Sequence, residues 1–236
     1  MSRLPSLRQP PIAFAHRGAS ANAPPNTLEA FRLGLRLGAT GLESDVWLTS
    51  DGIPVLDHDG RVRHGVRHHP IASIARRDLP SHIPALSDLY AECGADYELS
   101  LDLKDDRAAA ATLGAARAAG GAERLWLCHP DETFLAALRP EAGDVHLVHS
   151  THLRRMPHGP ERLAAQLADD GIEVVNLHRR EWSGGLTTLF HRFGRLTFGW
   201  DAQHERMVLE LLDMGIDGVY SNHVDRMMDA VRARAG

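Results

Sequence analysis

Residues 12–48 read IAFAHRGASANAPPNTLEAFRLGLRLGATGLESDVWL, and this stretch decides the fold. The runs Ile12–Ala15 and Leu42–Leu48 predict strands, because both are short, largely apolar and bounded by turn residues. Between them, Thr27–Leu37 carries apolar residues at helical spacing. The stretch therefore predicts a strand, a helix and a second strand in succession.

The same alternation of a short apolar run with a helical pattern continues along the rest of the chain. Asn26 and Glu29 have the spacing of a capping box at the start of the first helix. Eight strands are predicted, at residues 12–15, 42–48, 97–103, 125–127, 145–148, 173–177, 196–199 and 218–220. Eight helices are predicted, at residues 27–37, 86–93, 107–119, 132–138, 160–168, 186–193, 204–214 and 224–234.

Eight strand-helix units favour a closed (β/α)8 TIM barrel, since 236 residues is close to the roughly 250 typical of that fold. An open doubly wound sheet is the alternative, but no G-x-G-x-x-G or G-x-x-x-x-G-K motif follows the first strand. Residues 58–79 are too many for a tight turn and predict a small excursion over the barrel mouth, after the second strand. We expect a single domain over residues 1–236, with its core at about residues 12–234.

The composition is that of an ordinary globular protein, with 43% apolar and 24% charged residues. A net charge of -5 argues against a nucleic-acid partner, because nucleic-acid modules usually carry a basic surplus. We expect no stable membrane insertion, since the chain lacks both a signal peptide's apolar core and a run of roughly 18 apolar residues. With only Cys93 and Cys128 and no C-x-x-C, we expect reduced thiols, a cytoplasmic location and no structural zinc.

Charged residues gather at the carboxyl ends of the early strands, where TIM barrels build their sites. Glu43 and Asp45 share one face of the second strand, because side chains alternate along a strand. By the same rule Asp102 and Lys104 point into the barrel if the leucines between them face the helices. Converging carboxylates repel one another unless a cation neutralises them, and oxygen ligands suit Mg²⁺ or Ca²⁺ better than zinc. The pattern therefore predicts a divalent-metal site at the barrel mouth.

Two histidines stand out because each ends a short extended run. His16 follows the first strand, and His58 follows the run Pro54–Leu56. Three further side chains follow later strands, where a barrel places its pocket walls, namely His129, His178 and Trp200. We interpret the following histidines as surface or core residues with no special role: His64, His68, His69, His82, His152, His158 and His191.

Five segments of the sequence, in this order, resemble the glycerophosphodiester phosphodiesterases: AHRGASANAPPNTLEAF, GATGLESDVWLTSDGIPVLDHD, IPALSDLY, LSLDLKDD and LLDMGIDGVYSN. The N-terminal half is the specific part, because it joins HRG, NT-x-x-AF, E-x-D-V-x-L-T-x-D-G-x-P-V and HD. The resemblance implies a TIM barrel, in agreement with the strand count. It also implies an enzyme that hydrolyses small glycerophosphodiesters to glycerol phosphate and an alcohol such as choline or ethanolamine.

The resemblance further implies a role for individual positions of this chain. It implies ligands for a divalent cation, Mg²⁺ or Ca²⁺, an acid and a base, and two cations that bind the phosphate. The ligand positions hold Glu43, Asp45 and Asp102, the phosphate-binding positions hold Arg17 and Lys104, and the acid and base positions hold His16 and His58, with the choice between these two left open. We also expect Trp200 to pack against the carbon skeleton of the substrate.

The chain departs from the family pattern in four places. Pro25 and Asp102 stand where the family has glutamates, Gly199-Trp200-Asp201-Ala202 stands where it has Trp-Thr-Val-Asn, and Ser221-Asn222 stands where it has Thr-Asp. Aspartate is one methylene shorter than glutamate, so at position 102 either the metal shifts toward the third strand or a water molecule fills the gap, and we favour the water. Two alternatives to the phosphodiesterase stay open: a phospholipase D that acts on lysophospholipids, and a catalytically silent barrel that binds phosphodiesters or a protein partner. The headgroup, the choice of metal and the oligomeric state also stay open.

Overall fold

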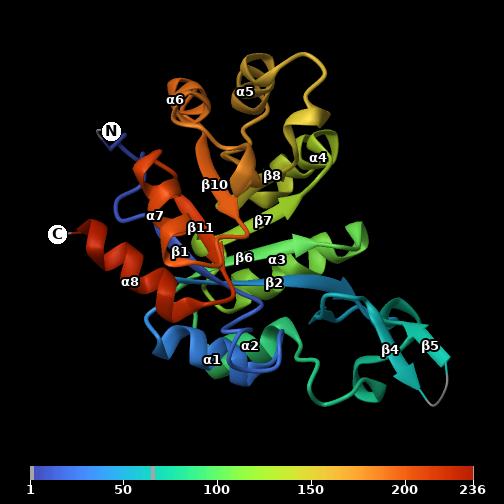
Figure 1. Ribbon diagram of the computed structural model, residues 1–236. Coiled ribbons are helices and arrows are strands. Elements are labelled where there is room, and N and C mark those ends of the chain that lie inside the picture. The colour runs from blue at the N-terminus through green and yellow to red at the C-terminus, as the bar shows by residue number, and fades with distance from the viewer. Residues whose placement is uncertain (1–2, 65–66, 236) are drawn as a thin grey trace.

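The computed structural model describes residues 3–64 and 67–235 and contains eight parallel strands closed into a barrel (Figure 1). The first strand pairs with both the second and the last, and these two pairings close the sheet. The predicted (β/α)8 barrel is thereby confirmed. In order around the barrel, the strands are β1 (Ile12–His16), β2 (Gly41–Leu48), β6 (Glu98–Leu103), β7 (Leu125–His129), β8 (His146–Ser150), β9 (Val174–His178), β10 (Leu196–Trp200) and β11 (Gly218–Ser221).

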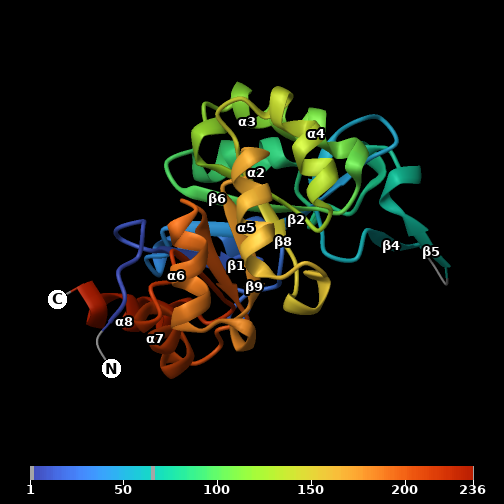
Figure 2. The same ribbon diagram turned by 90° about the horizontal axis from the view of Figure 1, so that it is seen from above.

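Helices connect the strands and pack around the outside of the barrel (Figures 1 and 2). Each has one apolar face, as α1 shows by burying Ala30, Phe31 and Gly34 while its charged residues face outward. The helices lie close to the predicted ranges, at α1 (Leu28–Arg36), α2 (Leu86–Cys93), α3 (Ala109–Ala118), α4 (Glu132–Ala142), α5 (Pro160–Asp169), α6 (Gly184–Arg192), α7 (Glu205–Asp213) and α8 (Val224–Ala235).

The core has two layers, which the alternation along each strand separates. Leu101 and Leu103 belong to the outer layer between strands and helices, so Asp102 between them points into the barrel, as predicted. The inner layer is largely aromatic and fills the barrel below its mouth. There the rings of Phe14 and Tyr220 stack with their centroids 4.7 Å apart. This packed floor leaves the carboxyl ends of the strands as the place for a site.

The start of α1 differs from the prediction. Thr27 is the N-cap, and its hydroxyl accepts a hydrogen bond from the backbone N–H of Ala30. Asn26 instead adopts a left-handed backbone, with φ of 58°, and its side chain accepts a hydrogen bond from the buried Ser44 hydroxyl. The predicted capping box of Asn26 and Glu29 is therefore wrong, because Asn26 turns the chain and ties it to β2.

The excursion after β2 contains more regular structure than the sequence predicts. It begins with β3 (Pro54–Leu56), which pairs antiparallel with β2. The strands β4 (Arg61–His64) and β5 (Arg67–Pro70) then pair antiparallel and stand away from the barrel (Figure 1). Buried Val62 of β4 packs in a small apolar cluster with Ile71 and Leu79. The expectation of an irregular segment is wrong at these strands.

Two expectations from composition can be compared with the structure. None of the helices in residues 3–64 and 67–235 is long and apolar enough to cross a bilayer. Cys93 and Cys128 are both free thiols, the first packed against the outer layer and the second inside the barrel. Burial raises the pKa of the Cys128 thiol well above its usual value, so this side chain is an apolar, protonated part of the core.

Candidate active site

A cavity of about 310 Å³ opens at the carboxyl ends of the barrel strands. The eight site residues predicted from the sequence all line it, together with three that were not predicted. The predicted residues are His16, Arg17, Glu43, Asp45, His58, Asp102, Lys104 and Trp200, and the additional ones are Ser150, Asn176 and Tyr220. The roles assigned to these residues stay predictions.

A tight turn after β1 brings the chain to the first of the carboxylates. Arg17 and Gly18 both have positive φ, 55° and 74°. At Gly18 a Cβ atom would lie 2.5 Å from the carbonyl carbon of Ala30, so only glycine fits this close approach. The turn aims the backbone N–H of Arg17 at Glu43, and it donates a hydrogen bond to Oε2 over 2.9 Å.

Three carboxylates converge at the floor of the cavity. One oxygen each of Glu43, Asp45 and Asp102 lies within 4.8 Å of the others. This follows from register, because Asp45 on β2 lies directly beside Asp102 on β6. Glu43 and Asp45 are only 5% and 2% exposed. Burial, reinforced by the charges of Asp45 and Asp102, raises the pKa of Glu43 well above its usual value.

Two cations compensate part of this negative charge. The Lys104 ammonium lies 3.1 Å from Asp45 Oδ1 and 3.0 Å from Asp102 Oδ2. Burial alone would lower the pKa of Lys104, but the two carboxylates outweigh it and raise the pKa. Arg17 is less well placed, with Nε 3.7 Å from Asp45 Oδ2. In the described parts of the chain, neither of these two buried atoms has a hydrogen-bond partner.

The cluster therefore fits a further cation. Three carboxylates face two basic side chains, and the unpartnered Asp45 Oδ2 is a buried oxygen that lacks a donor. Leaving such an oxygen unpartnered is unfavourable by about 1–3 kcal/mol or more. The three grouped atoms are all carboxylate oxygens, the donor type that a hard cation such as Mg²⁺ or Ca²⁺ prefers. Glu43, Asp45 and Asp102 are the residues that would hold it.

The two histidines of the cavity each have a hydrogen-bonding partner on Nδ1. His16 Nδ1 lies 2.6 Å from Asn222 Oδ1, and its Nε2 lies 3.7 Å from Glu43 Oε2. Burial lowers the pKa of His16, an effect that the hydrogen bond to Asn222 opposes only in part. His58 is more exposed, and its Nδ1 lies 2.7 Å from Asp59 Oδ1. Both rings can therefore present Nε2 to a ligand.

The later strands supply the opposite wall of the cavity. Trp200 lines it, as predicted, and the edge of the His178 ring contacts the indole with centroids 4.5 Å apart. His178 is not among the residues that line this cavity, and it donates a hydrogen bond to Asp201. The prediction that His178 is a wall residue is therefore wrong for this cavity.

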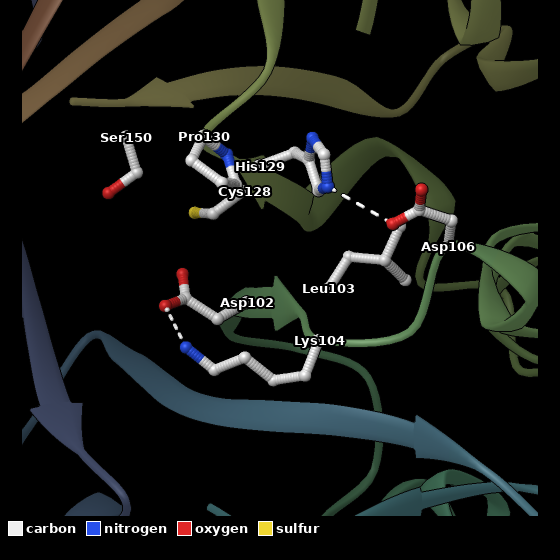
Figure 3. Close-up of a pocket in the computed structure, with 8 residues that line it drawn as sticks. All are labelled: Asp102, Leu103, Lys104, Asp106, Cys128, His129, Pro130 and Ser150. Atoms are coloured by element: carbon white, nitrogen blue, oxygen red, sulfur yellow. Dashed lines mark hydrogen bonds and ion pairs between the residues drawn. The ribbon is translucent and has the colours of Figure 1, made fainter. Parts of the chain in front are cut away.

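His129 lines a different hollow, a neighbouring pocket of about 300 Å³ (Figure 3). In Figure 3 its Nε2 points to Asp106 Oδ1, 3.2 Å away. The pocket adjoins the first cavity and shares three of its residues, Asp102, Lys104 and Ser150. His129 is thus a wall residue of this adjoining pocket and not of the main cavity.

Sequence reasoning missed four residues that the barrel brings to the site. Ser150, Asn176 and Tyr220 lie in three separate late strands, and Asn222 follows the last strand. Asn176 and Tyr220 are polar residues within short apolar runs, and Ser150 and Asn222 lie among other polar residues at strand ends, so none of them stands out in the sequence. Their position at or near the carboxyl end of a strand could have identified them, because the carboxyl ends of all eight strands meet at one mouth.

The mouth of this closed barrel gathers three carboxylates, two basic side chains and two histidines. Such a site suits a class of protein that binds a negatively charged ligand together with a divalent cation. Comparisons with known proteins narrow this class. Residues 16–82 match the glycerophosphoryl diester phosphodiesterase family. The chain is also 28% identical to probable glycerophosphodiester phosphodiesterase 2 of Mycobacterium tuberculosis, over 94% of this chain and 91% of that protein. These matches confirm the resemblance of the chain to the glycerophosphodiester phosphodiesterase family.

Further matches agree with this assignment. Human glycerophosphodiester phosphodiesterase 1 is 42% identical over 98 residues, which cover 34% of this chain and 30% of the human protein. A solved structure of a glycerophosphoryl diester phosphodiesterase from Silicibacter pomeroyi has the same fold, with a TM-score of 0.84 and 20% identity over 96% of this chain and 95% of that one. An Oleispira antarctica phosphodiesterase, solved with its product sn-glycerol-3-phosphate, aligns over 94% of this chain and 97% of its own with a TM-score of 0.79 and 20% identity.

Proposed function

We propose that this chain hydrolyses glycerophosphodiesters to glycerol phosphate and an alcohol, with a divalent cation held by Glu43, Asp45 and Asp102. The match to the family and the similar proteins support this class of reaction. The acidic cluster supports the binding of a divalent cation. The neighbour from Oleispira antarctica, solved with sn-glycerol-3-phosphate, supports a small ligand of this chemistry.

The side chains around the cavity divide the chemistry of such a reaction between them. When bound, the cation would draw electron density from the phosphate oxygens and offset their charge. Arg17 and Lys104 add two positive charges beside the same carboxylates and would orient the phosphate. Trp200 on the opposite wall would pack against the carbon skeleton of the substrate.

The histidines would move the two protons that the reaction requires. The attacking hydroxyl, from water or from the glycerol part itself, loses a proton, and the departing alkoxide gains one. His16 is suited to accept, because burial lowers its pKa and its Nδ1 donates to Asn222, so the Nε2 lone pair is free. Donation to the departing alkoxide then belongs to His58, the other histidine of the cavity.

The observation that carries this proposal is the incomplete compensation of the acidic cluster. Asp45 is 2% exposed, yet its Oδ2 lies 3.7 Å from Arg17 Nε and has no hydrogen-bond partner among the described residues. A cluster built only for stability would pair this oxygen, because an unpaired buried polar atom destabilises the fold. The arrangement instead suits a ligand that brings positive charge.

One assay tests the proposal directly. Release of choline from glycerophosphocholine, or of ethanolamine from glycerophosphoethanolamine, is measured after EDTA treatment and again after Mg²⁺ or Ca²⁺ is added. We expect no turnover after chelation and recovery with one of the two cations. Full activity in excess EDTA would overturn the metal requirement. Turnover of lysophosphatidylcholine in preference to both substrates would favour the lysophospholipase D alternative, and no turnover of any substrate would favour the silent barrel.

A further inference from the structure

A chain of hydrogen bonds leads from His16 away from the cavity and into the ends of β10 and β11. The first link is His16 Nδ1 to Asn222 Oδ1, at 2.6 Å. The backbone N–H of Asn222 then donates to Gln203 Oε1 over 3.0 Å. Gln203 follows β10 and Asn222 follows β11, so this link joins two neighbouring strands just outside the site.

The direction of each further link is fixed by the one before it. Gln203 uses its oxygen to accept from a backbone N–H, so its amide nitrogen is left to donate, and it lies 3.3 Å from Asp201 Oδ1. The other oxygen of Asp201 lies 3.1 Å from His178 Nε2. His178 Nδ1 accepts from the backbone N–H of Arg180 over 3.2 Å, so neutral His178 carries its proton on Nε2 and donates it to Asp201.

Two backbone N–H groups therefore fix the direction of these hydrogen bonds. The N–H of Arg180 fixes the His178 tautomer, and the N–H of Asn222 fixes the Gln203 amide. Asp201 is held between them in a left-handed conformation with φ of 68°, a region that aspartate enters more readily than most residues. Its surroundings thus determine the partners of both carboxylate oxygens.

We propose that Gln203 is a positioning residue for His16: it holds the loop that carries Asn222, and Asn222 in turn keeps the His16 proton on Nδ1 and leaves Nε2 directed toward the cavity. An amide oxygen can only accept, so Asn222 Oδ1 selects this tautomer. The inference rests on the proposed function in one respect, that His16 exchanges a proton with the substrate. It adds that the geometry of this exchange is set by residues outside the cavity lining.

The tautomer can be measured without any substrate. Long-range ¹H–¹⁵N spectra of the uniformly labelled full chain at pH 7 distinguish the two ring nitrogens of each neutral histidine. The His16 signals are identified by their loss in His16→Asn. We expect protonated Nδ1 and unprotonated Nε2 in the wild type. The reverse tautomer in the wild type would overturn the inference, whether or not the protein hydrolyses glycerophosphodiesters.

Two variants test the link to turnover. Gln203→Met keeps the length of the side chain but removes both polar atoms, so we expect kcat to fall by about 10–100-fold with little change in KM. We also expect a mixed His16 tautomer in its spectrum. Gln166→Met is the matched control, because Gln166 is exposed on α5 and its side chain donates one weak hydrogen bond, to Glu132 over 3.3 Å. It should match the wild type in rate and in spectrum.

Substitution of Asn222 provides a rescue test. Asn222→Leu removes the acceptor and should lower kcat at least as much as Gln203→Met, whereas Asn222→Asp keeps an acceptor oxygen and should restore the Nδ1-protonated ring. Thermal unfolding shows that each variant is folded before it is assayed. Normal kcat and an unchanged His16 spectrum in folded Gln203→Met would refute the positioning role. Loss of kcat with an unchanged spectrum would also refute it, since Gln203 would then act by another route.

Discussion

The two ends of the barrel both bury carboxylates, but only one end pairs them completely. At the end where the strands begin, Asp217 is fully buried. It accepts hydrogen bonds from the side chains of Ser6, His191 and Thr197 and from the backbone N–H of Leu7, at 2.7–3.0 Å. Each of its oxygens is thus supplied with donors from within the described chain.

At the end where the strands finish, the carboxylates are gathered without sufficient donors. Glu43 accepts one backbone N–H, and Asp45 shares Lys104 with Asp102. Asp45 Oδ2 is left with the distant Arg17 Nε. Burial alone therefore does not show whether a carboxylate of this fold stabilises the structure or binds a ligand. The difference lies in the hydrogen bonds: the protein supplies donors to both oxygens of the stabilising carboxylate and leaves an oxygen of the ligand-binding one without a donor.

The largest effect we expect comes from removing charge at the incomplete end. Glu43→Gln keeps the acceptor for the Arg17 N–H but removes one of three repelling carboxylates and one ligand. Turnover should fall to the assay background. Without cations the free energy of unfolding should rise, and about 1 kcal/mol would raise Tm by about 2–4 °C.

Thermal unfolding in EDTA, together with the choline-release assay, checks both halves of this prediction. Glu141→Gln, at an exposed residue of α4, is the control and should change neither quantity. A variant that loses both activity and stability would show that Glu43 is a structural carboxylate like Asp217.

A second prediction concerns the proton carriers of the same end. His58→Ala should lower kcat by about 10²–10⁴-fold, the usual contribution of a positioned acid or base. The unfolding free energy should change little, because the His58 side chain is 46% exposed. His82→Ala, at an exposed histidine outside the cavity, serves as the control. If kcat of His58→Ala stays near the wild-type value, the second proton carrier must be sought at another residue.

The complete end should respond in the opposite way. Asp217→Ala should lower the unfolding free energy by about 3–5 kcal/mol, because it strips several buried donors of their acceptor. Activity per folded molecule should be retained. Ser6→Ala removes one of the same hydrogen bonds and should cost only about 1 kcal/mol. Urea unfolding at pH 7 measures both. A loss of kcat in folded Asp217→Ala would mean that the two ends are coupled.

The same residue predicts a dependence of stability on pH. Burial alone would raise the pKa of Asp217, but the hydrogen bonds from His191 and Ser6 outweigh it and lower the pKa below its usual 3.8. The unfolded chain therefore takes up this proton at higher pH than the folded one. The stabilisation is complete above about pH 4 and is lost as pH falls through the lowered pKa. In Asp217→Asn this part of the acid destabilisation should be absent, which urea unfolding between pH 3 and 6 would show.

The smallest effect we expect lies at Asp102. Its carboxylate is 34% exposed and shared with Lys104, so it is the loosest of the three candidate ligands. Asp102→Glu lengthens the side chain by one methylene and should displace a bridging water, giving metal binding a few-fold tighter. Calorimetric titration of Mg²⁺ and Ca²⁺ into both proteins decides this. Equal or weaker binding by the variant would contradict it, and no heat from either protein would count against the metal site itself.

The barrel was predictable from the sequence because strand and helix patterns alternate in it without interruption. The antiparallel pair of β4 and β5 was not, since arginine and histidine dominate its strands and few residues favour β structure. It depends on buried Val62, a tertiary contact that local pattern does not show. Asn26 was assigned to a cap for a similar reason, because its tie to Ser44 depends on how α1 meets β2.

The charged residues of the site were predictable from the sequence, and its uncharged polar residues were much less so. Glu43 and Asp45 share a strand, so simple alternation puts them on one face. Asn222 reaches His16 only because β11 pairs with β1, and no local pattern relates two residues 206 positions apart. The residues that sequence reasoning missed are those whose relation to the site depends on barrel closure.

That closure also decides when the site can exist during synthesis of the chain. His16 leaves the ribosome early, but its partner Asn222 is translated 206 residues later. At typical rates of about 5–20 residues per second, that interval lasts roughly 10–40 s. Until β11 has emerged and paired with β1, the edge of β1 is open and the imidazole lacks its partner Asn222 on Nδ1. The charged residues of β2 and β6 are translated early, but the contact that orients His16 forms only after nearly all of the fold is in place.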